Sequence, residues 1–361
     1  MNISQAKSFI KEIRTLNDIV PALVGPKGIG KTEMLKQVAA ELGIGYQAVY
    51  PSSLQGEDFM GLLQKDPLTK TTQYLAPDFF PTDNAVAKGL FPEEGIFVLE
   101  EFNRGDAQTI SSLFPLLQER NINGHKLAPG WTLAVCMNPD NIKYTTNSID
   151  NAGLDRILPV NIMPDLDEYS SYMIRSEQAN DDILNFLFVN KELFNIDESN
   201  NDMEKSPSPR GWTKISRLMN ICRLDDAMLI ASLNGLVGSS AGASFLGWRA
   251  DRDVVYPDYE AILKKYDSKQ KKIVKDIVKN NRYDVMNLTF KRLVLHFDHT
   301  DKNQVKNMNA FVKDMDKEMN VLLAKQLIME RRNEGTEILE VMPAFKAEVL
   351  DKIINVISEA A

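Results

Sequence analysis

The sequence is poor in the residues that build disulfide frameworks and metal clusters. Its 361 residues include two cysteines, Cys136 and Cys222, and three histidines, His125, His296 and His299. The cysteines lie far apart, and Cys136 stands inside an apolar run, where a small buried thiol is the ordinary arrangement. The histidines form no ligand cluster with either cysteine. A disulfide scaffold is therefore not expected, and a reducing compartment suits the free thiols.

Long apolar runs are also absent. No run approaches the ~18 apolar residues of a membrane span, and the N-terminus lacks the apolar core of a signal peptide. We therefore expect a cytoplasmic protein that does not enter a membrane.

A large excess of positive charge is missing as well. Acidic residues outnumber basic residues by 50 to 42, whereas a broad nucleic-acid-binding face usually carries a clustered basic excess. Nucleic acid is therefore not expected as a partner. The best candidate for a local basic patch is the stretch 264–275, for which a solvated helix face is the favoured interpretation.

What the sequence does contain is a complete phosphate-binding motif. Residues 25–32 spell G-P-K-G-I-G-K-T, which fits G-x-x-x-x-G-K-[ST], between an apolar run at 22–24 and a helical pattern at 33–42. Glycines permit backbone conformations that bring successive N–H groups to phosphate oxygens, and the helix start adds its dipole. Lys31 can reach the β- and γ-phosphates, and the Thr32 hydroxyl can ligate Mg²⁺. The residues predicted to hold a nucleoside triphosphate are Gly25, Pro26, Lys27, Gly28, Ile29, Gly30, Lys31 and Thr32.

Apolar runs of strand length alternate with helical patterns in the first half of the chain. This alternation predicts an α/β fold with a parallel sheet covered by helices and with ligands at the carboxyl ends of the strands. The predicted strands are residues 22–24, 47–50, 96–99, 133–137 and 160–162. The helices between them are predicted at residues 33–42, 108–120 and 149–156.

Beyond residue 164 the pattern becomes helical. A stripe of methionines and Phe311 recurs at helical spacing within residues 308–322, which predicts a core seam rather than a binding groove. The helices predicted here include residues 167–177, 183–194, 305–330 and 344–359.

Two acids follow one of the predicted strands. Residues 96–99 lead directly into Glu100 and Glu101. In P-loop ATPases the first acid at such a strand end helps to hold Mg²⁺, and the second polarises the attacking water. A chance pair of surface glutamates is common after a strand, but the continuation F-N-R-G-D at residues 102–106 makes the motif more specific.

With this continuation the chain resembles the MoxR-like branch of the AAA+ ATPases, of the helix-2-insert, dynein-related type, where an apolar run precedes D-E-I-N-R-A. The similarity covers roughly residues 11–218. Residues 52–62 resemble the insertion in helix 2 that precedes a hairpin, and residues 112–124 resemble the family's L-L-x-x-x-x-E-R segment and second hairpin. The resemblance implies an AAA+ α/β domain at 1–165, an α-helical lid at 166–300 and a helical C-terminal extension at 301–361.

The resemblance also assigns roles to three further polar residues. Asn138, in M-N-P, matches the residue that senses the γ-phosphate, and Arg156, in G-L-D-R-I, matches the arginine finger that acts on a neighbouring subunit's nucleotide. Arg210, in S-P-R, matches a lid arginine that contacts nucleotide in the same subunit. Simpler interpretations remain open: an Asn-Pro turn, an arginine paired with Asp155, and a helix start at a proline.

Three positions leave questions for the structure. Arg104 and Arg120 also match family arginines, with a role at a subunit interface and local salt bridging equally open. Glu100 departs from the family, which usually has Asp, and the extra methylene moves the carboxylate by about 1.5 Å. Nucleotide binding is expected to survive this change, whereas slow turnover is one open outcome.

The implied function is binding and hydrolysis of ATP with Mg²⁺ at the subunit interfaces of a hexameric ring. Such a ring would remodel a protein or help to insert a cofactor or metal, with a von Willebrand factor A-domain protein as the expected partner. The catalytic set would be Glu101, Asn138, Arg156 and Arg210, and the metal set Thr32 and Glu100.

Two alternatives stay open. One is a DNA-directed AAA+ motor or a McrB-like GTPase, against which the second hairpin argues because its only basic side chains are His125 and Lys126. The other is a nucleotide-gated scaffold with little turnover, which Glu100 suggests.

Overall fold

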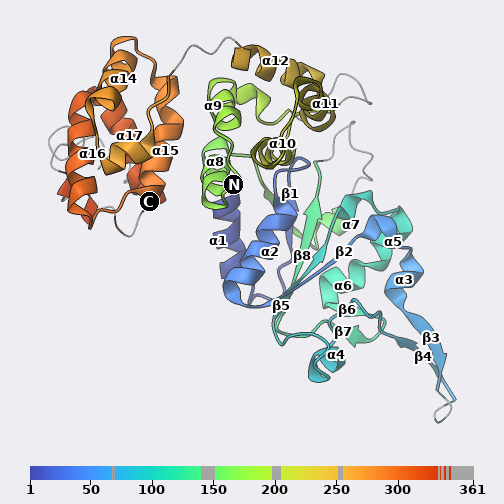
Figure 1. Cartoon of the computed structure of the whole chain (residues 1–361). Helices are drawn as coiled ribbons and strands as arrows, with labels where there is room; N and C mark the ends of the chain where they lie inside the picture. Colours follow the sequence, from blue (N-terminus) through green and yellow to red (C-terminus); the bar gives the residue numbers. More distant parts are fainter. Residues whose placement is uncertain are drawn as a thin grey trace. The chain divides into compact units, whose positions relative to one another are not determined.

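The chain folds into two compact units. The computed structural model describes residues 1–66, 68, 70–139, 151–196, 205–250 and 255–331, together with residues 334, 337, 338, 341 and 342. The first unit contains Met1–Glu168 and Ser208–Arg210, and the second contains Tyr169–Ile196 and the described residues from Gly211 onward (Figure 1). Within the described ranges, no helix combines the length and the apolar character that crossing a membrane requires.

A five-stranded sheet forms the centre of the first unit, and every pairing between its neighbouring strands is parallel. The strand order is β2-β5-β8-β1-β9, so β1 lies between two strands that come much later in the sequence. The predicted strands are found within about two residues of their expected positions. Their observed bounds are β1 Pro21–Val24, β2 Gly45–Val49, β5 Gly95–Leu99, β8 Trp131–Met137 and β9 Leu158–Asn161.

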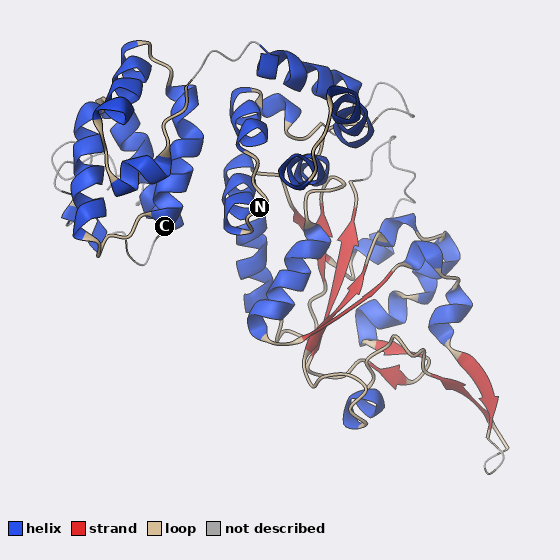
Figure 2. Ribbon diagram, viewed as in Figure 1, coloured by secondary structure: helices blue, strands red, loops and turns tan. Residues whose placement is uncertain are grey.

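Helices cover both faces of this sheet (Figure 2). Because side chains alternate along a strand, Ile96 and Val98 of β5 enter one apolar layer, whereas Phe97 and Leu99 enter the other. The first layer includes residues of α1 Ile3–Ile13 and α2 Lys31–Leu42. The second includes residues of α5 Ala107–Ser112 and α6 Phe114–Glu119.

The single helix predicted at residues 108–120 is two helices. α5 ends at Ser112 and α6 starts at Phe114, with Pro115 in its first turn. Proline has no N–H to donate to the carbonyl group four residues earlier, and its ring clashes with that carbonyl, so one helix ends and a second begins just before it.

Two hairpins extend from the first unit at the places that the family resemblance predicts. After α3 Gly56–Met60, β3 Leu62–Lys65 pairs with β4 Thr72–Leu75, and β6 Asn121–Ile122 pairs with β7 His125–Lys126. Gly61 joins α3 to β3 with a φ of 81°, and a Cβ there would lie 1.9 Å from the Leu75 carbonyl oxygen, so only glycine fits. The His125 ring contacts the Tyr74 carbonyl oxygen at 2.7 Å, which ties the two hairpins together. The remaining short helices of this unit are α4 Asp83–Ala87 and α7 Asn151–Leu154.

One tryptophan of the first unit lies against two glycines. Added Cβ atoms at Gly45 and Gly95 would stand 3.0 and 2.7 Å from the Trp131 ring. The ring is buried, and its Nε1 donates to the Pro92 carbonyl oxygen at 3.0 Å. The absence of a side chain at Gly45 and Gly95 therefore leaves the space that the Trp131 ring fills.

The described residues of the second unit contain helices and no strand. An aromatic cluster packs part of it, with the Phe186 ring in contact with Trp212, Phe245 and Trp248. The helices, of which α8 and α10 begin in the first unit, are α8 Leu166–Arg175, α9 Asp181–Val189, α10 Pro209–Ile221, α11 Asp226–Val237, α12 Ser239–Ala250, α13 Tyr259–Lys264, α14 Ser268–Lys279, α15 Met286–His296, α16 Lys302–Asp314 and α17 Lys317–Glu330.

The methionine stripe belongs to a buried core, as predicted. Met308, Phe311, Met315 and Met319 all lie in one apolar cluster that runs from Ile262 to Met342. The predicted boundary at residue 300 falls inside the sequence span of this cluster, and the division into lid and extension stays a prediction.

Residues 305–330 were expected as one helix but form two. Met315 is extended, with a ψ of 160°, and the Asp316 side chain accepts from Met319 N and caps α17. The helix predicted at 344–359 lies outside the described residues.

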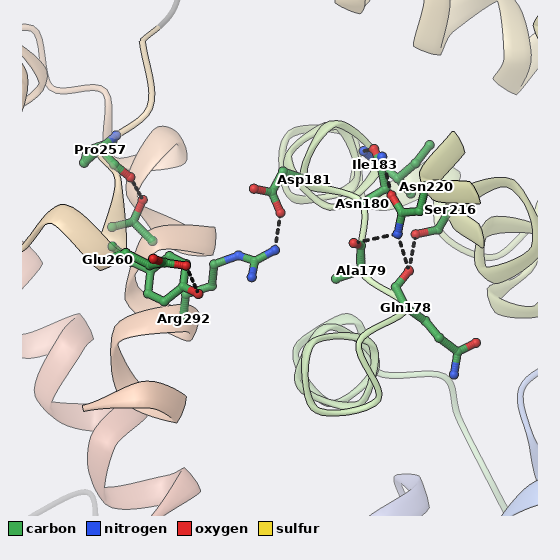
Figure 3. A network of polar contacts seen from close by, with 12 residues as sticks. Gln178, Ala179, Asn180, Asp181, Ile183, Ser216, Asn220, Pro257, Glu260 and Arg292 are labelled. Atoms are coloured by element: carbon green, nitrogen blue, oxygen red, sulfur yellow. Dashed lines mark hydrogen bonds and ion pairs between the residues drawn. The ribbon is translucent and has the colours of Figure 1, made fainter. Parts of the chain in front are cut away.

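Polar contacts join the elements of the second unit (Figure 3). Arg292 of α15 pairs with Asp181 at the start of α9. The side chains of Ser216 and Asn220 on α10 both donate to the Gln178 carbonyl oxygen, at 2.5 and 3.4 Å. The α10 side chains thus hold the segment before α9 through hydrogen bonds, and α15 holds the start of α9 through the ion pair.

Candidate nucleotide-binding site

The polar residues singled out in the sequence follow three neighbouring strands of the sheet. β5, β8 and β1 are adjacent and parallel, so their carboxyl ends meet at one edge. Glu100 and Glu101 follow β5, Asn138 follows β8, and the P-loop, residues 25–30, follows β1. This sheet order brings together residues that lie more than a hundred positions apart in the sequence.

The P-loop has the backbone that its glycines predict. Gly28 and Gly30 have φ values of 77° and 105°, in the left-handed region that other residues rarely adopt. An added Cβ at Gly25 would lie 2.6 Å from the Ile162 carbonyl oxygen, so this position must stay small. At Gly30 an added Cβ would meet no heavy atom within 4 Å. The loop is therefore closely packed at Gly25 and unobstructed at Gly30.

Lys31 is the buried cation of the site. Its Nζ donates to the carbonyl oxygens of Gly25 and Pro26 at 2.6 and 3.0 Å, and to Asn138 Oδ1 at 3.3 Å. Burial lowers the pKa of Lys31, although Cys136 and Glu100 oppose that shift. The predicted phosphate-binding lysine and the predicted γ-phosphate sensor are thus in direct contact.

Glu100 is buried between the neighbouring strands, with 4% of its surface exposed. The Tyr46 hydroxyl on β2 donates to Glu100 Oε1 at 3.4 Å, and Glu100 N donates to the Val49 carbonyl oxygen at 2.8 Å. Burial raises the pKa of the Cys136 thiol on β8, and the nearby Glu100 carboxylate contributes to the shift. The first acid is therefore held by β2 on one side and faces β8 on the other.

Glu101 lies at a sharp reversal of the chain. Its φ and ψ of 51° and 37° are left-handed, which is uncommon for a residue with a side chain. The Glu101 carboxylate pairs with the Arg104 guanidinium at 2.8 Å, and both side chains are about half exposed. The reversal turns the second acid out of the buried strand in which Glu100 lies.

Asn103 lies in the motif that follows the two acids, and the sequence does not predict it as a site residue. Its Nδ2 donates to the Asn138 carbonyl oxygen at 2.9 Å, and Asn138 N donates to Asn103 Oδ1 at 3.3 Å. Both residues are buried. Asn103 therefore fixes the backbone of Asn138. In the sequence, only the position of Asn103 just after the two acids indicated a role. Its contact with Asn138 could not be predicted, because the two residues lie 35 positions apart.

Of the two predicted arginines outside the sheet, Arg210 contacts the P-loop and Arg156 contacts a helix. Arg210 N, in the first turn of α10, donates to the Gly28 carbonyl oxygen at 3.1 Å, which brings the S-P-R motif to the P-loop. Arg156 follows α7, and its Nε donates to Gln118 Oε1 at 3.1 Å while its guanidinium lies 5.0 Å from the Phe114 ring centroid. Arg156 thus packs against α6.

The two arginines with open roles have local partners. Arg104 forms the ion pair with Glu101. Arg120, with a φ of 55°, donates from its guanidinium to the carbonyl oxygens of Ala128 and Trp131. Arg120 therefore holds the chain between the second hairpin and β8.

Comparison with known families agrees with this geometry. Residues 22–157 match the AAA domain of the dynein-related subfamily. This segment is an AAA domain. It contains the P-loop, both acids, Asn138 and Arg156, and the predicted AAA+ P-loop fold with a parallel sheet and a following helical region is confirmed.

Comparisons over the whole chain add little to the AAA domain match. A comparison with curated proteins finds no match. Among solved structures, the chain is similar to the Thermotoga maritima RuvB Holliday junction branch migration motor, with 12% identity, a TM-score of 0.36, and coverage of 78% of this chain and 76% of that chain. A mutant of the same protein gives 13% identity and a TM-score of 0.36 over the same shares of the two chains.

The residues of the AAA domain fit a nucleotide with Mg²⁺. Gly28 and Gly30 have the left-handed backbone that lets a P-loop present its N–H groups to phosphate, and the buried Lys31 follows directly at the start of α2. The Thr32 hydroxyl and the Glu100 carboxylate are the hard oxygen donors that Mg²⁺ prefers. The donor set therefore suits a magnesium-bound triphosphate.

Proposed function

We propose that this protein binds ATP and hydrolyses it at the AAA domain. The observation that carries the proposal is the meeting of Lys31, Asn138 and Glu100 at the carboxyl edge of β1, β8 and β5. Residues 25–32 would hold the phosphates, and the helix start of α2 would add its positive dipole end. The same arrangement in P-loop ATPases positions a triphosphate for attack by water.

Each polar side chain has a distinct role in this proposal. Lys31 neutralises the β- and γ-phosphates, and Glu101 polarises the attacking water once its carboxylate is turned from Arg104. Asn138 reports the γ-phosphate, and its backbone is kept in place by Asn103. Thr32 and Glu100 would hold Mg²⁺, which when bound neutralises charge on the phosphate oxygens.

The two distal arginines complete the proposed site. Arg210 would contact nucleotide in its own subunit, because its backbone is bonded to the P-loop at Gly28. Arg156 would act as a finger on a neighbouring subunit's nucleotide, since a guanidinium stays charged and can bridge phosphoryl oxygens. That role requires an assembly, and we propose a hexameric ring.

The biological task that we propose is the remodelling of a protein partner or assistance in inserting a cofactor or metal. The support is the resemblance of the motif series to MoxR-like ATPases, including the positions of the two hairpins. A von Willebrand factor A-domain protein is the partner that this resemblance favours.

A second candidate is a nucleotide-gated scaffold with little turnover. The observation in its favour is Glu100, whose side chain is longer than the usual aspartate and is bonded to Tyr46. In this case nucleotide would change the conformation or assembly of the protein without being consumed at an appreciable rate.

Calorimetric titration with ATP tests the proposal. Lys31→Ala should abolish high-affinity binding because it removes the buried cation of the P-loop, whereas Lys36→Ala, which removes an exposed charge from the same helix, should leave it intact. Unchanged ATP affinity in Lys31→Ala would overturn the assignment. Phosphate release with ATP or GTP, with and without DNA, then separates the ATPase from the scaffold, the GTPase and the DNA-directed motor.

A further inference from the structure

The C-terminal helices carry a strongly basic stretch that the ATPase function does not use. Residues 264–282 contain eight lysines and arginines and two aspartates, in a chain whose net charge is −8. Four of these lysines lie on α14 at i, i+3, i+6 and i+10, a spacing that confines them to about a third of the helix circumference. They are Lys269, Lys272, Lys275 and Lys279, and we call them the lysine face.

Most of the lysine face is not neutralised by its surroundings. Lys275 Nζ pairs with Asp314 Oδ1 at 3.2 Å. Lys269, Lys272 and Lys279 are exposed, and within the described part of the chain no hydrogen bond or ion pair joins them to another residue. Three unpaired lysines therefore line one side of a helix about 18 Å long. The exposed Asp276 lies on the same side, which keeps an excess of positive charge.

The opposite side of α14 is committed to the core. Val274 and Ile277 are buried in the same apolar cluster as Phe311, and Gln270 is buried with them. An amphipathic helix that binds a lipid surface must insert its apolar side, and α14 has already buried that side in the protein. The lysine face is therefore a solvent-exposed surface on a helix that is packed in the core, and it does not act as a membrane anchor.

The composition of the face also argues against a protein partner. Interface cores are enriched in aromatic residues and arginine and depleted in lysine, and binding energy concentrates on such anchors. α14 contains no aromatic residue and no arginine. Lysine is instead a compact point charge that binds phosphate without demanding a particular geometry.

The overall acidity of the chain does not oppose a local contact of this kind. Exposed charges are screened beyond about 8 Å at physiological ionic strength, which is less than the length of α14. The net charge of −8 argues against a broad basic surface, but a polyanion on the lysine face experiences mainly the charges beside it.

We propose that the lysine face binds the sugar–phosphate backbone of nucleic acid without reading its sequence. Within α14, arginine and asparagine are absent and the one glutamine, Gln270, is buried, so the side chains that make bidentate contacts with base edges are not offered and the contact is mainly electrostatic. Such binding is weak, on the order of 10⁻⁴ to 10⁻⁶ M at physiological salt, and depends steeply on salt.

The test is fluorescence anisotropy of a labelled DNA duplex of about 20 base pairs and mixed sequence, without nucleotide, between about 50 and 200 mM salt. The variant replaces Lys269, Lys272 and Lys279 with Gln, which keeps helix propensity and removes three charges. The control makes the same change at Lys88, Lys191 and Lys214, three exposed lysines that lie on different elements and share no helix face. ATP affinity and the thermal midpoint check that both variants are folded.

We expect the α14 variant to lose about tenfold or more in duplex affinity at low salt, and the slope of log K against log salt to fall by about 2.7. The control should change affinity by less than about twofold. Equal losses in both variants would show a general charge effect and overturn the proposal. The proposal would also be overturned if the parent protein did not bind the duplex, or if it bound poly-glutamate or anionic vesicles instead of the duplex. Because no nucleotide is present, these outcomes are independent of whether the protein hydrolyses ATP.

Discussion

Glu101 has a left-handed backbone, which is uncommon for a residue with a side chain, and this conformation separates it from Glu100. Glu101→Gln keeps the shape of the side chain but removes the carboxylate that polarises water. We expect hydrolysis to fall by about 10²-fold or more with ATP affinity retained, measured by phosphate release and calorimetry. Glu57→Gln, at an exposed position of α3, is the control. Hydrolysis at the parental rate in Glu101→Gln would place the base elsewhere.

Glu100 offers a second test at the scale of one residue. If its extra methylene displaces the carboxylate from the metal, Glu100→Asp should raise turnover with little change in ATP affinity, in steady-state phosphate release. The Tyr46 hydroxyl donates to Glu100 Oε1, however, and a shorter side chain gives up that bond. A fall in turnover would therefore mean that β2 has adapted to glutamate, and Tyr46→Phe in the parent should then lower turnover as well.

Single residues were predictable where their chemistry is fixed by a local motif. The P-loop conformation follows from glycines spaced within eight residues, and the structure has it. The function of Arg120 was not predictable, because its partners are carbonyl oxygens of Ala128 and Trp131 that come near only when the second hairpin closes. Tyr46 was missed for the same reason, since strand pairing alone places it beside Glu100.

At the scale of elements, the strands β5 and β8 are coupled through Asn103 and Asn138. Asn103→Ala removes two buried hydrogen bonds and leaves the backbone groups of Asn138 without these partners. We expect a loss of about 1–3 kcal/mol in the free energy of unfolding, measured with urea. Turnover should also fall, because the Asn138 side chain is no longer held in position.

The control for this substitution is Asn84→Ala, at an exposed position of α4. It should change neither stability nor turnover by a measurable amount. If Asn103→Ala behaved like this control, the paired asparagines would not couple the two strands.

Helix boundaries were predicted less well than strands. Apolar periodicity continued through residues 108–120 and 305–330, yet both segments are interrupted, at Pro115 and at the capping residue Asp316. Both interruptions were visible as local residue types, but periodicity alone does not distinguish one helix from two that pack on the same core. The sheet was predicted better because its strands are apolar on both faces, as a central parallel sheet requires.

At the scale of the whole molecule, the role of Arg156 decides whether the active unit is an assembly. A finger acts across an interface, so Arg156→Ala should leave ATP binding intact and lower hydrolysis by about 10³-fold. Mixing the inactive Lys31→Ala and Arg156→Ala proteins should restore part of the activity, because some interfaces then pair an intact P-loop with an intact finger. The measurement is phosphate release, with mixed assembly verified by co-purification of the two proteins when each carries a different tag.

Two results would contradict the ring. One is a failure of mixed assemblies to recover activity, which would show that Arg156 does not act on its neighbour. The other is full ATPase activity from a protein that sediments only as a monomer.

The positions of the tryptophans have a spectroscopic consequence. Trp131 belongs to the first unit, whereas Trp212 and Trp248 lie in the aromatic cluster of the second, so each unit carries its own fluorophores. A Trp212→Phe, Trp248→Phe protein emits from Trp131 alone and should report the melting of the AAA domain. Saturation with ATP at about 100 times its dissociation constant should stabilise that domain by about 2.7 kcal/mol and raise the midpoint of this emission. Trp131→Phe emits from the second unit and should show a smaller shift, unless both units melt as one cooperative body.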